Sequence, residues 1–138
     1  YDFALSFAGA DRDVAGALFD KLSEAQVEVF YDKNEQHRIL AQDVEEYLRP
    51  IYQTEAEFVV VLLGREYPER IWTKIESDAF KDRFADGGVI PIWFAGLDQS
   101  MFDTTRARGG LSFDRSKDFE QQISEVANGL LQKLGEDR

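Results

Sequence analysis

Trp72 and Glu76 offer the most specific chemistry in this sequence. Four residues apart on an expected helix, their side chains share one face, with Cβ atoms about 5–6 Å apart. An indole can stack on a flat cationic heterocycle. A carboxylate can accept hydrogen bonds from sugar hydroxyls and stabilise positive charge that develops on a sugar carbon. By spacing alone, a core tryptophan beside a solvated acid is the commoner arrangement, so the pair needs support from its surroundings.

The segment from Phe7 to Arg12 has small residues where a strand is expected to turn into a helix. Such a turn lets backbone N–H groups approach a phosphate, although the sequence matches neither G-x-G-x-x-G nor the P-loop. We expect Asp11 to cap the helix that follows, which would make this an ordinary capped turn. Together with Asp13 and Asp32, Asp11 also has the chemistry to hold Mg²⁺, but helix capping is the preferred reading.

A polar loop over residues 31–38 adds positive charge to an otherwise acidic chain, through Lys33, His37 and Arg38. It can act as a mobile flap over a neighbouring site or remain a solvated loop. His37 is the only histidine, and nothing in its surroundings favours it as a catalytic base.

Strand-like and helix-like patterns alternate along the chain and must position these groups. The expected strands are residues 1–7, 27–31, 58–63, 89–93 and 111–113. The expected helices are one that follows Asp11 and runs to about residue 26, a shorter one capped by Asp43, 72–83 and 117–134, with residues 64–71 as a loop. This alternation predicts an α/β fold with a five-stranded parallel sheet in the flavodoxin-like order 2-1-3-4-5 and helices on both faces. Its ligand crevice would lie where the strand order reverses, between the first and third strands.

Composition excludes several functional classes. The 138 residues fit one domain, and a net charge of −11 argues against direct binding to nucleic acid or an anionic membrane. With no cysteine, disulfides, thiolate metal sites and cysteine nucleophiles are excluded. A single histidine argues against a poly-histidine metal site or a Ser-His-Asp triad, and we expect neither a metal nor a bound cofactor. No apolar run approaches the ~20 residues of a membrane span, so we expect a cytoplasmic protein. The chain opens inside an apolar stretch, which suggests one domain, residues 1–138, of a longer protein.

Several segments together resemble the Toll/interleukin-1 receptor (TIR) domains. Residues 1–9 (YDFALSFAG) are similar to the first conserved box of that family, and residues 27–32 (VEVFYD) to its second strand and the start of its BB loop. Residues 58–63 (FVVVLL), followed by 72–76 (WTKIE), are similar to its third strand and the WxxxE segment of enzymatic members. These segments keep the order and spacing of the family over nearly the whole chain. The chain is similar to bacterial TIR domains that are attached to sensor modules in antiphage defence proteins.

The resemblance implies hydrolysis or cyclisation of NAD⁺, with NAD⁺ as substrate and no further cofactor. It makes Glu76 the catalytic glutamate and places Trp72 near the nicotinamide. The other substrate-binding residues that it implies are Phe7, Ala8, Asp11 and Arg12 after the first strand, and Phe30, Tyr31, Asp32 and Lys33 at the pocket mouth. A single carboxylate suffices for this chemistry because the pyridinium leaving group departs neutral and needs no general acid.

The implied partners are NAD⁺, further copies of the domain bound through the BB loop, and a fused sensor domain. Three alternatives remain. A non-catalytic TIR module would signal by homotypic assembly alone. A phosphoacceptor receiver domain shares the topology but needs an aspartate after the third strand, where this chain has Leu63 and Gly64. A nucleoside deoxyribosyltransferase also cuts an N-glycosidic bond with a carboxylate, but the first-box similarity favours a TIR domain.

Overall fold

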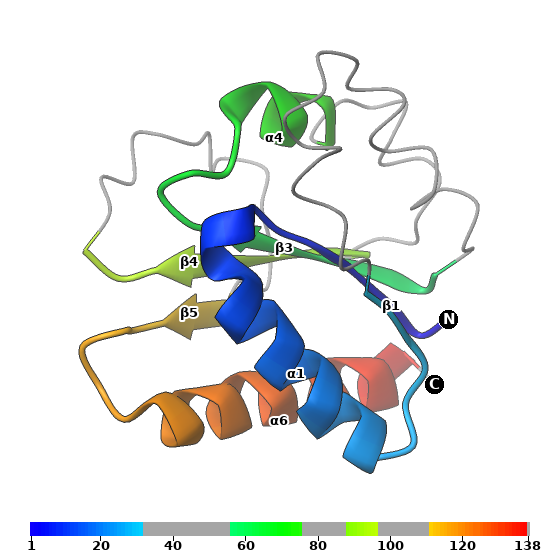
Figure 1. The fold of residues 1–138 in the computed structure, drawn as a ribbon. Helices are drawn as coiled ribbons and strands as arrows, with labels where there is room; N and C mark the ends of the chain where they lie inside the picture. The colour runs from blue at the N-terminus through cyan, green and yellow to red at the C-terminus, as the bar shows by residue number, and fades with distance from the viewer. Residues whose placement is uncertain (32–55, 76–87, 97–110, 138) are drawn as a thin grey trace.

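The chain folds around a parallel sheet with helices on either side (Figure 1). The structure, a computed structural model, describes residues 1–31, 56–75, 88–96 and 111–137. The strands are β1 (Phe3–Ser6), β2 (Val29–Phe30), β3 (Phe58–Leu63), β4 (Val89–Phe94) and β5 (Leu111–Phe113). The helices are the 3₁₀ turn η1 (Gly9–Asp11), α1 (Arg12–Glu24), α4 (Glu69–Ile75) and α6 (Phe119–Asp137).

The sheet has five strands in the order β2-β1-β3-β4-β5, which confirms the predicted flavodoxin-like topology. Every described strand pair is parallel. In the register, Ser6 of β1 lies beside Val61 of β3, and Leu63 of β3 lies beside Trp93 of β4. The strand order reverses between β1 and β3, so the segments that leave these two strands depart to opposite faces of the sheet.

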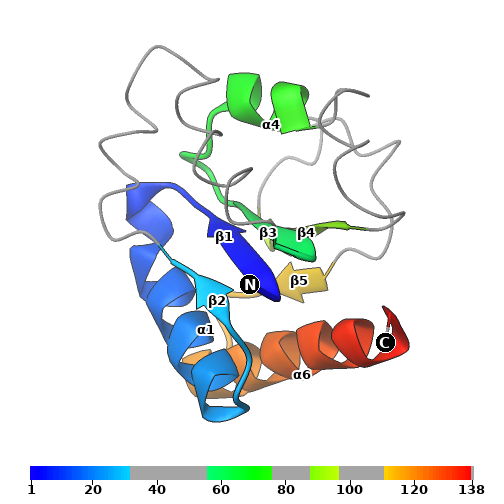
Figure 2. The same ribbon diagram turned by 90° about the vertical axis from the view of Figure 1, so that its right-hand side faces the viewer.

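Helices cover both faces of the sheet, as the sequence predicts. In Figure 2, α6 lies below the strands and α1 runs down their left side, whereas α4 lies above them. Along β1 the side chains alternate between the two faces of the sheet. Phe3 and Leu5 join the core between the sheet and helices α1 and α6, whereas Ala4 joins the core between the sheet and α4. All six residues of β3 are buried, as expected for a central parallel strand whose two faces are both covered.

The longest described helix, α6, is amphipathic. Its buried stripe contains Ile123, Val126, Leu130 and Leu134, spaced so that they share one face of a 3.6-residue helix. A side-chain oxygen of Asp118 accepts a hydrogen bond from the Gln121 backbone N–H at 2.9 Å, which satisfies a donor of the first turn. No helix in the described part of the chain is long and apolar enough to cross a membrane.

Several element boundaries differ from the prediction. β1 and β2 are shorter than expected, because they are paired only over residues 3–6 and 29–30. α1 ends at Glu24, where Gln26 takes a left-handed backbone (φ 62°) and its N–H bonds to the Ser23 carbonyl. This closes the helix two residues earlier than its apolar pattern suggests. The end of β4 and both ends of α6 shift by one to three residues.

The prediction of a loop over residues 64–71 is wrong at its end, because α4 already begins at Glu69. The Pro68 carbonyl accepts hydrogen bonds from the backbone N–H groups of Ile71 and Trp72, at 3.1 and 3.3 Å. Proline therefore precedes the first turn, where its missing N–H costs nothing. The helix expected after Asp43, the 31–38 loop beyond Tyr31 and the continuation of α4 to residue 83 lie outside the described residues.

Candidate functional site

The carboxyl edge of the sheet, beside the β1–β3 reversal, brings most of the described candidate residues together. β1 ends at Ser6 and leads through η1 into α1 on one face; β3 ends at Leu63 and leads into α4 on the other. In Figure 1 the arrowheads of β4 and β5 point toward the same side as the start of α1. The crevice of such a fold lies at this edge, between residues 7–12 and 64–69.

Aromatic stacking joins two of the predicted pocket residues. The ring of Phe7, after β1, stacks on that of Tyr31, after β2, with centroids 5.5 Å apart and an interplanar angle of 22°. Phe19 of α1 contacts the same tyrosine ring at 5.3 Å. Phe7 and Ala8 are buried, and Tyr31 is half-buried. The ends of two neighbouring strands are thereby fixed to each other at the edge of the predicted site.

An ion-pair cluster that the sequence did not reveal lies beside this stack. The Arg115 guanidinium, from the loop between β5 and α6, donates from Nη2 to Asp11 Oδ1 at 2.9 Å. It also donates to both carboxylate oxygens of Asp13, at 2.9 and 3.0 Å, in the bidentate geometry that suits a guanidinium and a carboxylate. The same group lies over the Phe94 ring, 5.5 Å from its centroid.

The two aspartates of this cluster have opposite electrostatic environments. Burial raises the pKa of the Asp11 carboxyl, despite the opposing hydrogen bond from Arg115, because a desolvated carboxylate favours its neutral form. The hydrogen bond from Arg115 lowers the pKa of Asp13, whose side chain is 54% exposed against 7% for Asp11. These hydrogen bonds also raise the pKa of Arg115, so the cluster holds a fixed cation.

The expectation that the Asp11 side chain caps α1 is wrong. Asp11 occupies the N-cap position, but its carboxylate makes no capping hydrogen bond because it is directed to Arg115 and to the end of β3. Its Oδ2 atom is buried and has no hydrogen-bond partner in the described structure. A Cβ atom added to Gly64 would lie 2.0 Å from this oxygen. The carboxylate therefore packs directly against a glycine that leaves room for it.

Trp72 belongs to the core beneath α4. Its side chain is 2% exposed and contacts Trp93 of β4 edge-on, with ring centroids 6.2 Å apart and an interplanar angle of 79°. Nearby, the hydroxyls of Ser6 and Tyr67 share a buried hydrogen bond of 2.7 Å, which ties the end of β1 to the loop before α4. Trp72 thus anchors α4 to the sheet, and its predicted position beside the nicotinamide stays a prediction.

The remaining predicted residues divide into exposed ones and ones outside the described ranges. Arg12 is exposed at the first position of α1, and it has no ion pair among the residues that the structure describes. Phe30 is half-buried and meets the Tyr1 ring edge-on at 5.8 Å. Asp32, Lys33, His37 and Glu76 lie outside the described residues. Within the described ranges no cluster of three or more acidic, histidine or cysteine side chains suits a metal ion.

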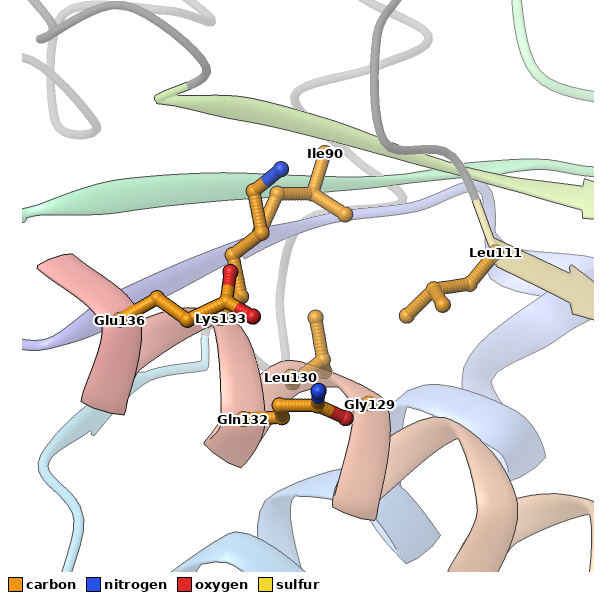
Figure 3. A pocket seen from close by; sticks show the side chains of 7 residues that line it. All are labelled: Ile90, Leu111, Gly129, Leu130, Gln132, Lys133 and Glu136. Atoms are coloured by element: carbon orange, nitrogen blue, oxygen red, sulfur yellow. The ribbon is translucent and has the colours of Figure 1, made fainter.

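A separate hollow of about 280 Å³ lies between α6 and strands β4 and β5. In Figure 3 Ile90, Leu111 and Leu130 line it with apolar side chains, and Lys133 and Glu136 of α6 line another side of it. Gly129 belongs to its wall, and a Cβ atom there would lie 3.0 Å from a methyl group of Leu111. None of its lining residues was predicted to bind a ligand, and the hollow does not include the β1–β3 reversal.

Comparison with known proteins agrees with this architecture. Residues 3–127 match the model of the TIR domain family. The chain is 35% identical over 83 residues to the 3′ cyclic ADP-D-ribose synthase AaTIR of Aquimarina amphilecti. That match covers 60% of this chain and 25% of the relative, so the chain spans about a quarter of that protein's length. With the family match extending over most of the sequence and the sheet order that the resemblance implied, this chain belongs to the TIR domain family.

Proposed function

We propose that this domain consumes NAD⁺ by cutting the bond between nicotinamide and ribose. The observation that carries the proposal is the 35% identity to a 3′ cyclic ADP-D-ribose synthase within the same family. The products would be nicotinamide together with ADP-ribose or one of its cyclic isomers. A dinucleotide is a suitable ligand for this fold, because folds of this type bind ligands in a crevice beyond the carboxyl ends of the strands.

The residues at the carboxyl edge of the sheet support the part of this proposal that concerns substrate binding. The turn that holds Ala8 and Asp11 adjoins the stacked rings of Phe7 and Tyr31, where the nicotinamide riboside would lie. Arg12 presents an exposed cation on the same turn, suited to the negative charge of a pyrophosphate. Arg115, in contrast, is already engaged by two carboxylates, so we do not assign it to the substrate.

Glu76 is the residue that we propose to act on the reacting carbon, by analogy with enzymatic family members. Nicotinamide leaves as a neutral molecule, so the transition state needs no general acid, only stabilisation of positive charge on the ribose. One carboxylate that accepts hydrogen bonds from the ribose hydroxyls can supply it. The scheme suits a chain with no cysteine and one histidine, and it predicts a rate that varies little with pH near neutrality.

The buried position of Trp72 is as compatible with a second candidate function, a TIR domain that only mediates protein assembly, as it is with an enzyme. An indole that packs against Trp93 is also expected in a TIR domain that only mediates protein assembly. In the enzymatic proposal, this packing fixes the start of α4 and thereby the chain that leads into Glu76. Release of nicotinamide separates the two candidates, because an interaction module would release none.

The decisive variant is Glu76→Gln, with Glu69→Gln as its matched control. Both remove one carboxylate charge, and Glu69 is an exposed residue in the first turn of α4. We expect Glu76→Gln to fold normally and to lose nicotinamide release by about 100-fold or more, the range for a lost transition-state contact. Glu69→Gln should stay within about twofold of wild type. Equal activity of Glu76→Gln and wild type would rule out this glutamate as the catalytic group.

We propose further that the domain becomes active when several copies assemble. By resemblance, the BB loop of one domain completes the site of its neighbour in a head-to-tail array, a heterologous contact that builds open filaments. A net charge of −11 keeps dilute chains apart, so activity should rise steeply with chain concentration. A fused sensor domain that triggers assembly during bacterial antiphage defence would supply the signal. Full turnover in a sample that elutes as a monomer would refute this part.

A further inference from the structure

Asp11 joins three segments that are distant in the sequence. Its carboxylate belongs to the turn after β1, its Oδ2 packs on Gly64 after β3, and its Oδ1 accepts a hydrogen bond from Arg115, 104 residues away. These segments meet at the carboxyl edge beside the strand-order reversal. The position of the 8–12 turn relative to the rest of this edge therefore depends on what holds one side chain.

Arg115 is the group that holds it. Among the described residues, the Asp11 side chain makes no capping bond, and its second oxygen has no hydrogen-bond partner. A carboxylate with 7% exposure is costly to bury without a cation or donors. Without Arg115, Asp11 would have to turn outward or take up a proton, and the turn would lose its fixed position.

The guanidinium is itself held in place by its neighbours. The Asp13 carboxylate accepts two hydrogen bonds from the guanidinium, and the Phe94 ring lies against one of its faces. The loop that carries it is fixed as well, because the Asp114 side chain accepts hydrogen bonds from the Ser116 backbone N–H and hydroxyl, at 2.9 and 2.6 Å. Such a supported donor acts as a positioning group at little entropic cost.

We propose that Arg115 is a positioning residue for NAD⁺ binding, which acts through Asp11 on the turn formed by residues 8–12. The inference rests on the proposed function, and it concerns the binding of the substrate rather than the bond-breaking step. Arg115 touches neither substrate nor reacting atoms in this account. Loss of its guanidinium therefore raises KM for NAD⁺ and leaves kcat nearly unchanged, because the carboxylate assigned to the chemistry lies on a different segment.

The test compares Arg115→Ala with Lys117→Ala at a chain concentration where wild-type turnover is maximal. Lys117 is exposed in the same loop, so both variants remove one positive charge from it. We expect KM to rise about 10-fold in Arg115→Ala, because the displaced turn loses about one contact to the substrate, with kcat within about threefold of wild type. Lys117→Ala should keep both constants.

Chemical rescue separates positioning from a general loss of structure. Methylguanidinium can occupy the space left between Asp11 and Asp13 in Arg115→Ala, and it should lower KM toward the wild-type value. Methylurea has the same shape without the charge and should not. Arg115→Lys keeps the positive charge but loses the planar, bidentate donor geometry of the guanidinium, so it should have an intermediate KM. If Arg115→Ala does not fold, the KM of Arg115→Lys is compared with wild type in its place.

The outcomes are distinguishable. A wild type that consumes no NAD⁺ overturns the proposed function, and with it this inference. An active wild type whose KM is unmoved by Arg115→Ala, or by Arg115→Lys if the alanine variant does not fold, overturns the positioning role alone. Equal rescue by methylurea and methylguanidinium, or an equal rise of KM in Lys117→Ala, also overturns it. A KM that rises in Arg115→Ala and falls again only with the cation supports the role.

Discussion

Replacing Gly64 by alanine should force Asp11 out of its buried position. The added Cβ atom would lie 2.0 Å from Asp11 Oδ2, 2.8 Å from Cγ and 3.0 Å from Oδ1. All three contacts are to the carboxyl group that Arg115 holds. Gly64 has no left-handed φ, so alanine meets no backbone strain there, and the whole effect comes from this overlap.

The expected cost follows from two contributions. Overpacking a filled site costs about 1–3 kcal/mol, and a hydrogen bond to a charged group contributes about 1.5–3 kcal/mol. Since the side chain can turn away and avoid part of the clash, the two do not add in full. We expect Gly64→Ala to lower the free energy of unfolding by about 2–3 kcal/mol, which corresponds to a fall in Tm of about 6–12 °C.

A double-mutant cycle with Asp11→Ala identifies the cause. In the Asp11→Ala background the space beside Gly64 is open, so the second substitution should cost less than about 0.5 kcal/mol, which gives a coupling of about 2 kcal/mol between the two sites. Gly135→Ala is the matched control, because a Cβ there has no neighbour within 4 Å. In a helix this change should be neutral or slightly stabilising.

Urea unfolding followed by circular dichroism gives these free energies directly. Additive costs of Gly64→Ala and Asp11→Ala would refute the packing argument, as would a Gly64→Ala variant as stable as Gly135→Ala. Loss of the coupling would also remove the basis for connecting the end of β3 to the turn after β1.

Three further substitutions test other parts of the structure. Tyr67→Phe removes the buried hydrogen bond to Ser6 and should cost about 1 kcal/mol of unfolding free energy, whereas Tyr1→Phe at an exposed ring should cost nothing measurable by urea titration. Asp13→Asn removes a carboxylate whose pKa is lowered by Arg115. That carboxylate contributes stability above its unfolded pKa, near 3.8, and loses it as pH falls through the lowered folded value. The variant should therefore be less stable than wild type by about 0.5–1 kcal/mol at pH 7, with the gap closing in acid; a gap independent of pH would contradict the assignment. Trp72→Phe should destabilise the domain by opening space against Trp93, by about 1–3 kcal/mol in the same titration; an unchanged midpoint would argue against a core role for the indole.

The sheet could be predicted from the sequence because its central strand is a continuous apolar run and its other strands are mostly apolar. β3 and β5 were predicted with the observed bounds, since residues 58–63 are apolar on both faces and glycines precede Leu111. The strand order followed from the alternation with helices. The ends of β1, β2 and α1 could not be predicted, because pairing partners and the left-handed Gln26 determine them, and neither appears in an apolar pattern.

The candidate site was predictable only where residues follow a strand end. Phe7, Ala8 and Tyr31 lie at the expected edge for that reason. Arg115 gave no signal, because it lies in a short polar segment, far along the chain from the aspartates it binds. Asp11 looked like a helix cap since aspartate before a helix usually is one, and only the distant guanidinium explains its different orientation.

A time course of NAD⁺ with the concentrated chain, resolved by chromatography, tests the central claim most directly. We expect NAD⁺ to disappear with one nicotinamide released per molecule consumed, ADP-ribose or a cyclic isomer to accumulate to match, and Glu76→Gln to slow both by about 100-fold or more. NAD⁺ that stays intact at every chain concentration, in samples shown by sizing to have assembled, would contradict the enzymatic account and leave the domain as an interaction module.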